Sequence, residues 1–213
     1  KYEIFLFDLD GTITDSALGI TNSVMYALKK FGIEETDRTK LYKFIGPPLT
    51  ESFEKFYGFT KEQSLDGVKY YREYYHDKGI YENRVYDGLE EVLKKINEAG
   101  KQAIVATSKP EKYAKIIIDH FHLTQYFACV AGMEMDGGRG TKAQVITYAL
   151  EKNDITDKSN VLMIGDREHD VIGAHENGLD CLGILYGFGS RKEFEEAGAD
   201  YIRENVEDIL QFV

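Results

Sequence analysis

The chain has 213 residues, of which 43% are hydrophobic and 13% are aromatic. This apolar content is enough for a packed core and argues against a disordered chain. The formal net charge is −11, which excludes the backbone of a nucleic acid as the main partner, because binding it needs clustered Lys and Arg. Any anion that the protein binds must therefore be held by a local site.

Neither a membrane-spanning helix nor a secretory signal is expected. No run approaches ~18 consecutive apolar residues, and no basic segment followed by an apolar one opens the chain. The two cysteines, Cys129 and Cys181, lie beside apolar stretches without the spacing of metal ligands, so we expect reduced core thiols. These features together predict a cytoplasmic protein with no membrane partner.

The first predicted element is a buried strand over Glu3–Phe7, which ends at the sequence Asp8-Leu9-Asp10-Gly11-Thr12. Because side chains alternate along a strand, Asp8 and Asp10 can project toward one point beyond the sheet edge, where open α/β sheets bind ligands. Two carboxylates at such a point favour a cation. Taken alone, the motif leaves open a purely structural acidic turn.

A helical insert follows this strand. The next predicted core strand begins only at Gln102, and helix-like stretches fill part of the gap. They lie at Ala17–Phe31, Asp37–Phe44, Leu49–Tyr57 and Lys61–Lys78. We therefore expect a small helical cap domain over residues 16–81. Lys43 and Gly46, in the break between two of its helices, are candidate substrate-binding residues; an ordinary interhelix turn is the alternative.

The rest of the chain alternates strand and helix signals. Four further strand-like runs lie at Gln102–Ala106, Phe127–Ala131, Asn160–Ile164 and Cys181–Leu185. Strands separated by amphipathic helices predict a parallel sheet with helices on both faces. The expected fold class is therefore α/β, a doubly wound Rossmann-like sheet of five main strands, with residues 1–15 and 82–213 forming the core domain.

Polar residues follow three of these later strands. Thr107 and Ser108 come directly after one strand and precede Pro110, where a hydroxyl and free amides can bind an anionic oxygen or simply cap a helix. Lys142 opens a predicted helix after a glycine-rich segment that lacks the spacing of a nucleotide P-loop. Asp166 and Asp170 follow another strand, and a helix beginning near Asp166 would bring both acids to one point.

In this order, the four motifs resemble those of the haloacid dehalogenase superfamily over nearly the full chain. The resemblance is closest to the phosphoglycolate phosphatase-like members that carry a helical cap. The matching residues are Asp8 to Ser16, Thr107, Lys142 and Gly165-Asp166 with Asp170. A member of this group would be a Mg²⁺-dependent phosphatase acting on a small phosphorylated metabolite, as a monomer or homodimer and without a nucleic-acid partner.

The resemblance assigns a role to each matching residue. Asp8 would attack phosphorus and form an aspartyl-phosphate, and Asp10 would act as the general acid and base. Thr107 and Lys142 would hold the phosphoryl oxygens, with substrate contacts from Gly11, Thr12 and Ser108. The Mg²⁺ ligands would be the carboxylates of Asp8 and Asp166 and the backbone carbonyl of Asp10, with Asp170 binding directly or through water.

Departures from other superfamily members narrow the expected reaction. Halide-removing and phosphonate-cleaving members lack an acid at the position of Asp10, so its presence favours an ester or anhydride of phosphate. Mutases of the same cap type carry a histidine where this chain has Ile20. A phosphoglycolate-like phosphomonoester is the expected substrate. A 5′-nucleotidase or inorganic pyrophosphatase remains open, with a mutase or a catalytically silent phosphometabolite-binding module less favoured.

Overall fold

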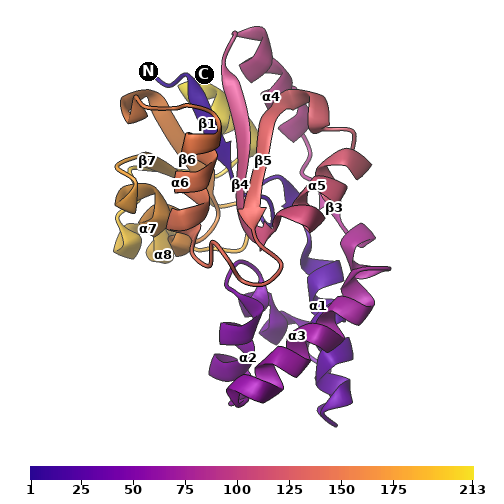
Figure 1. The fold of residues 1–213 in the computed structure, drawn as a ribbon. Helices are drawn as coiled ribbons and strands as arrows, with labels where there is room; N and C mark the ends of the chain where they lie inside the picture. Colours follow the sequence, from indigo (N-terminus) through magenta and orange to yellow (C-terminus); the bar gives the residue numbers. More distant parts are fainter. The chain divides into compact units, whose positions relative to one another are not determined.

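A computed structural model describes all 213 residues, and it contains one six-stranded parallel sheet (Figure 1). The strands are β1 (Ile4–Phe7), β4 (Gln102–Pro110), β5 (Phe127–Met133), β6 (Val161–Gly165), β7 (Asp180–Ile184) and β8 (Tyr201–Arg203). The expected α/β class is confirmed, but the sheet has one strand more than the five predicted. β8 was missed because three half-buried residues at a sheet edge give no readable apolar run.

The strands are arranged in the order β5-β4-β1-β6-β7-β8. This is a doubly wound sheet: from β1 the chain adds β4 and β5 on one side, and then β6, β7 and β8 on the other. In such sheets ligands bind at the carboxyl ends of the strands where the order reverses, here beside β1. Phe7, the last residue of β1, is level with Val105 on β4 and with Ile164 on β6. The residues that follow β1 therefore meet those that follow β6 and those near the end of β4.

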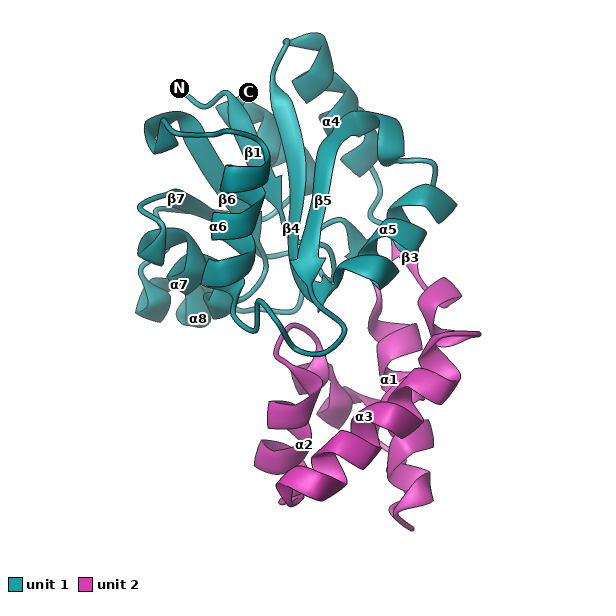
Figure 2. Cartoon of the chain, in the orientation of Figure 1, with its two compact units in different colours: residues 1–14, 85–213 teal, residues 15–84 magenta.

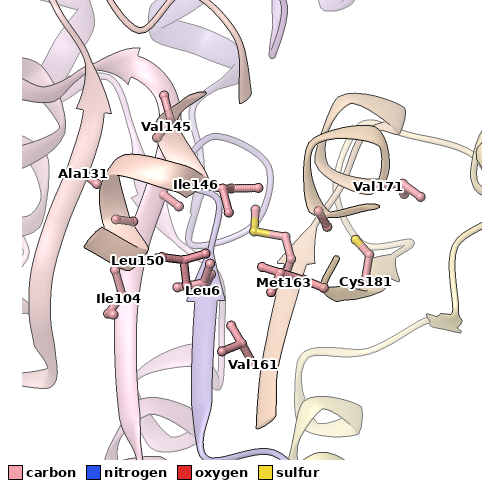
Figure 3. Packing of buried hydrophobic residues seen from close by; sticks show 14 of the residues in the cluster. Leu6, Ile104, Ala131, Val145, Ile146, Leu150, Val161, Met163, Val171 and Cys181 are labelled. Atoms are coloured by element: carbon pink, nitrogen blue, oxygen red, sulfur yellow. The ribbon is translucent and has the colours of Figure 1, made fainter. Parts of the chain in front are cut away.

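Helices cover both faces of the sheet (Figure 1). They are α4 (Leu89–Glu98), α5 (Glu111–His120), α6 (Lys142–Lys152), α7 (Glu168–Glu176) and α8 (Arg191–Ala197). Figure 3 shows one side of this core, where Ile146 and Leu150 of α6 pack with Leu6 of β1 and Met163 of β6. Burial of such side chains contributes about 1.5–3 kcal/mol each, which fixes α6 and its first residue, Lys142, against the sheet.

Residues 15–84 form a second compact unit, separate from the unit made by residues 1–14 and 85–213 (Figure 2). Its helices are α1 (Ala17–Lys30), α2 (Leu49–Tyr57) and α3 (Lys61–Tyr75), with short 3₁₀ helices η1 (Arg38–Phe44) and η2 (Gly79–Tyr81). The unit is helical as expected. The helix-like stretch ending at Phe44 is a 3₁₀ helix, and α3 ends at Tyr75 instead of Lys78.

The interior of the second unit is aromatic. The ring of Phe44 lies 5.2 Å from that of Phe53, and Phe53 stacks on Phe59 at 5.5 Å between centroids. The chain enters and leaves this unit through two short strands, β2 (Thr14–Asp15) and β3 (Arg84–Val85), which pair with each other. The small 3₁₀ helices of the first unit are η3 (Thr124–Tyr126), η4 (Lys158–Asn160) and η5 (Val206–Phe212).

Both cysteines are free thiols, with Cys181 buried and Cys129 partly buried. Burial raises the pKa of the Cys181 thiol, so the group stays protonated in the core. No helix combines the length and the apolar character that crossing a bilayer requires.

Candidate active site

The turn after β1 is held by its own backbone. The Leu9 carbonyl accepts hydrogen bonds from the N–H groups of Thr12, Ile13 and Thr14, and Gly11 donates to the Thr14 carbonyl at 2.8 Å. Leu9 and Ile13 are fully buried, so apolar packing supports the hydrogen bonds. The result is a rigid turn that directs the side chains before and within it toward the carboxyl edge of the sheet.

Asp8 is the first residue of this turn, and only 5% of its surface is exposed. Its Oδ1 accepts a hydrogen bond from the Leu9 N–H at 2.8 Å and lies 2.9 Å from the ammonium of Lys142. Both contacts fall on the same oxygen. These contacts on Oδ1 leave Oδ2 as the carboxylate oxygen of Asp8 for a metal ion or for chemistry.

Lys142 links two of the acids. Its buried ammonium lies 2.9 Å from Oδ1 of Asp8 and 2.9 Å from Oδ1 of Asp170, and it donates a hydrogen bond to the Ala106 carbonyl at 3.1 Å. Burial lowers the pKa of Lys142, but attraction from Asp170 and Asp8 outweighs it, so the net pKa is raised. Lys142 therefore stays charged at neutral pH.

Asp8, Asp166 and Asp170 form a buried acidic cluster in which one carboxylate oxygen of each lies within 4.8 Å of the others. Burial raises the pKa of Asp166 well above its usual value, and the nearby Asp170 and Asp8 carboxylates raise it further. Burial also raises the pKa of Asp170, to about 6, although Lys142 opposes the rise. The cluster thus holds more negative charge than Lys142 alone can balance.

The surroundings of Asp166 fit a divalent metal ion. Its Oδ1 is buried and has no hydrogen-bond partner, whereas Oδ2 accepts a hydrogen bond from the Phe188 N–H at 2.8 Å. A Cβ at Gly11 would collide with this carboxylate, so glycine lets the turn after β1 come close. An all-carboxylate donor set with an unsatisfied buried oxygen is what Mg²⁺ or another hard cation prefers.

Asp10 lies beside this cluster but is held by a different cation. Its Oδ2 is 3.1 Å from the ammonium of Lys109, and both side chains are buried. Its Oδ1 is buried without a hydrogen-bond partner. The Asp10 carboxylate is not one of the three clustered acids, and a metal contact from its backbone carbonyl stays a prediction.

Thr107 and Ser108 lie within β4, which runs through Pro110 rather than ending at Ala106 as predicted. The pairing with β5 shifts register between Ala106 and Pro110, which bends the strand end. The Thr107 hydroxyl is buried and accepts a hydrogen bond from the Lys109 N–H at 3.1 Å. Thr107 is thus adjacent to the Ala106 carbonyl that Lys142 contacts.

The helix that carries Asp170 begins later than predicted. α7 starts at Glu168 and not near Asp166, and the Asp170 carboxylate accepts a hydrogen bond from the Arg167 N–H at 3.1 Å. Asp170 therefore caps the helix that it belongs to. Asp166 lies in the turn before the helix, and the two acids still converge.

Sequence reasoning missed the segment after β7. The Tyr186 hydroxyl donates to the Thr12 carbonyl at 2.8 Å, and Phe188 donates its N–H to Asp166. Gly187 has no space for a Cβ, because the Gly11 carbonyl and the Asp166 side chain lie against it. The signal was present in the sequence Tyr186-Gly187-Phe188-Gly189, since glycines after a strand mark close backbone approach.

The two remaining candidates, Lys43 and Gly46, belong to the second unit. The Lys43 ammonium lies 4.4 Å from the centre of the Phe56 ring, a cation–π contact inside that unit. Gly46 adopts a positive φ of 111°, as a turn before two prolines requires.

In the first unit the structure brings Asp8, Lys142, Asp166 and Asp170 into one cluster. Gly11 lies against Asp166, and Asp10 and Thr107 both contact Lys109. The substrate contacts of Thr12 and Ser108 stay predictions.

Known proteins match both the sequence and the fold. The family model for haloacid dehalogenase-like hydrolases matches residues 5–184. A 5′-nucleotidase of Pseudomonas aeruginosa is 45% identical over 193 residues, covering 91% of this chain and 87% of that protein. A crystal structure of a predicted phosphatase from Clostridium acetobutylicum superposes with a TM-score of 0.96 at 48% identity, covering 99% and 97% of the two chains.

A third relative has a different described activity. The tyrosine-protein kinase PtkA of Mycobacterium tuberculosis is 35% identical over 188 residues, which cover 88% of this chain but 63% of that protein. The family match extends over most of the chain and includes all the strand-end motifs of the first unit. The chain therefore belongs to the haloacid dehalogenase-like hydrolase family.

Proposed function

We propose that this protein is a Mg²⁺-dependent phosphomonoesterase that acts on a small phosphorylated metabolite through an aspartyl-phosphate on Asp8. The observation that carries the proposal is the buried contact of Lys142 with Asp8 and Asp170, beside Asp166, at one edge of the sheet. A surface turn would not place several carboxylates and a lysine out of water together.

The proposal includes a metal ion because the substrate and the nucleophile are both negatively charged. A phosphate and a carboxylate nucleophile repel each other by about 5 kcal/mol per unit-charge pair at about 3.5 Å and an effective dielectric constant of about 20. Asp8 and Asp166, with the Asp10 carbonyl and with Asp170 directly or through water, would hold Mg²⁺. When bound, the ion would neutralise part of this charge.

The residues of the chain would then carry two displacement steps. In the first, Asp8 Oδ2 attacks phosphorus, the bond to the leaving oxygen breaks, and Asp10 gives that oxygen a proton. In the second, Asp10 takes a proton from water, the water oxygen bonds to phosphorus, and Asp8 is released with inorganic phosphate. Thr107 and Lys142, with Gly11, Thr12 and Ser108, would hold the phosphoryl oxygens.

A nucleoside monophosphate is the substrate class that we place first, and phosphoglycolate second. The 45% identity to a 5′-nucleotidase over most of both chains supports this order. We assign substrate selection to the second unit, where the Lys43 ammonium could meet a second anionic group. The proposal also includes a cytoplasmic location, which the two free cysteines support, and a monomeric or homodimeric state.

A phosphate-release panel tests the proposal. Nucleoside monophosphates, phosphoglycolate, pyrophosphate and glucose 1-phosphate would be incubated with the protein and Mg²⁺, with EDTA, and with EDTA followed by excess Mg²⁺. We expect release from at least one monoester, its loss in EDTA and its recovery with Mg²⁺. Stoichiometric binding without release would instead support a silent binding module, and release that EDTA does not change would exclude the metal.

A further inference from the structure

Lys109 is a buried lysine without a role in the matched motifs. Its side chain is 6% exposed, and its ammonium lies 3.1 Å from Oδ2 of Asp10, whose side chain is 11% exposed. Lysine is almost never this buried unless it is paired, because desolvating the ammonium is expensive. The contact with Asp10 therefore offsets an energetic cost that a solvated lysine would avoid.

The backbone around Lys109 is fixed on both sides. The Lys109 N–H donates to the Thr107 hydroxyl, and Pro110 precedes the first residue of α5. Gly132 on β5 lies so close to the Lys109 carbonyl that a Cβ there would not fit. A side chain that leaves a fixed backbone and ends in a buried site has few rotamers, so it can act as a rigid support.

The two oxygens of Asp10 are in different situations. Oδ2 is held by Lys109, and Oδ1 is buried without a hydrogen-bond partner. A carboxylate that shuttles a proton needs one oxygen free for the reacting group and an orientation that is kept through both steps. The pair has this arrangement, with the supporting cation on the oxygen that would not react.

We propose that Lys109 is a positioning residue that orients Asp10 for proton transfer. The inference rests on the proposed function of Asp10 as general acid and base. General acid catalysis matters most when the leaving oxygen is strongly basic. Loss of the support should therefore impair hydrolysis of an alkyl phosphate more than hydrolysis of p-nitrophenyl phosphate, whose leaving group needs little protonation.

Steady-state kinetics of Lys109→Met would test this inference on AMP, or on the best alkyl monoester of the panel, and on p-nitrophenyl phosphate. We expect kcat to fall about 10- to 100-fold on the alkyl ester and less than about threefold on p-nitrophenyl phosphate, with KM little changed. Lys109→Gln, which keeps a donor for Asp10, should retain more activity. Lys115→Met, which removes an exposed lysine of α5, is the matched control.

A double-mutant cycle separates positioning from other roles. In an Asp10→Asn background, Lys109→Met should have little further effect, because the group that it orients has lost its function. Equal losses on both substrates in a folded variant, or losses that add to those of Asp10→Asn, would overturn the inference while the phosphatase proposal stands. A parent protein that hydrolyses neither substrate would overturn both.

Discussion

Asp170 lies among groups that pull its protonation equilibrium in opposite directions. Burial and the Asp8 carboxylate raise its pKa, Lys142 lowers it, and the net value is about 6. Asp166 has no lysine in direct contact, and burial together with the Asp170 and Asp8 carboxylates raises its pKa. Buried carboxylates that lie close together destabilise the folded protein, because their like charges repel each other. A bound cation offsets this repulsion and therefore stabilises the folded state.

The pH dependence of stability follows from the Asp170 carboxyl. Its pKa is higher in the folded protein, about 6, than the 3.8 of the free side chain, so the folded state binds the proton more tightly. In EDTA, this group should therefore lower stability as pH rises through that interval. Between about pH 4 and about pH 7, Asp170→Asn should gain about 1–3 kcal/mol relative to the parent in denaturant melts.

Asp180 provides a control of opposite sign. The Tyr2 hydroxyl at 2.5 Å and the Lys1 ammonium at 2.9 Å hydrogen-bond its carboxylate and lower its pKa. As pH rises toward about 4, Asp180→Asn should therefore lose stability relative to the parent and the difference should then stay constant, at no more than about 1 kcal/mol because the pair is partly exposed. If both variants kept a constant difference from the parent at all pH values, the assigned pKa shifts would be wrong.

The segment between β7 and α8 is the element that supports the acidic cluster from one side. Its Phe188 N–H fixes one oxygen of Asp166 and leaves the other without a partner, and its Tyr186 hydroxyl holds the turn after β1. Loss of groups that orient metal-ligating residues typically lowers metal affinity about 10- to 100-fold. We expect this segment to act in that way.

Gly187→Ala tests the role of this segment. A methyl group there would meet the Gly11 carbonyl and Asp166, so the backbone must shift and the Phe188 N–H must move with it. We expect Mg²⁺ affinity, measured by isothermal titration calorimetry, to fall about 10- to 100-fold. Gly178→Ala, at a positive φ of 74° with open space around it, should lose stability but keep its affinity. Unchanged affinity in Gly187→Ala would exclude a positioning role.

Strand ends explain why most of the site could be predicted from the sequence. Apolar runs identified β1 and β6, and parallel pairing then required the acids at Asp8 and Asp166 to meet, whatever the details of the loops. Thr107 followed for the same reason, whereas Lys142, the first residue of α6, received its role from the family resemblance. Lys109 was missed because lysine is normally solvated, although its spacing of two from Thr107 suggested a shared side of the strand.

Other differences have local causes. Polar residues 107–109 continue β4 because pairing with β5, a tertiary contact, overrides their weak strand preference. The start of α7 depends on which backbone N–H donates to the Asp170 carboxylate. The sequence does not identify that donor, because several neighbouring N–H groups are equally near along the chain. The hydrogen bond from the Phe188 N–H to Asp166 uses a backbone group, so the type of residue at 188 does not predict it. The neighbouring Gly187, which allows the close approach, is the signal that the sequence offers.

At the scale of the whole molecule, all the groups proposed for chemistry belong to the unit made by residues 1–14 and 85–213. They come from distant parts of the chain that one sheet edge brings together. The net charge of −11 disfavours anionic substrates at long range, but salt screens that field within about 8 Å at physiological ionic strength. If the proposed function holds, binding of a phosphate therefore depends on Lys142 and a metal ion inside the site.

The role of Asp8 as nucleophile is tested most directly by mass spectrometry of Asp10→Asn after brief exposure to p-nitrophenyl phosphate. Without the base that activates water, the phosphoryl group should remain on the enzyme. We predict a mass increase of one phosphoryl group on the peptide that contains Asp8, and none in the Asp8→Asn/Asp10→Asn double variant. A phosphoryl group on another residue, or sustained turnover by Asp8→Asn alone, would contradict the assignment.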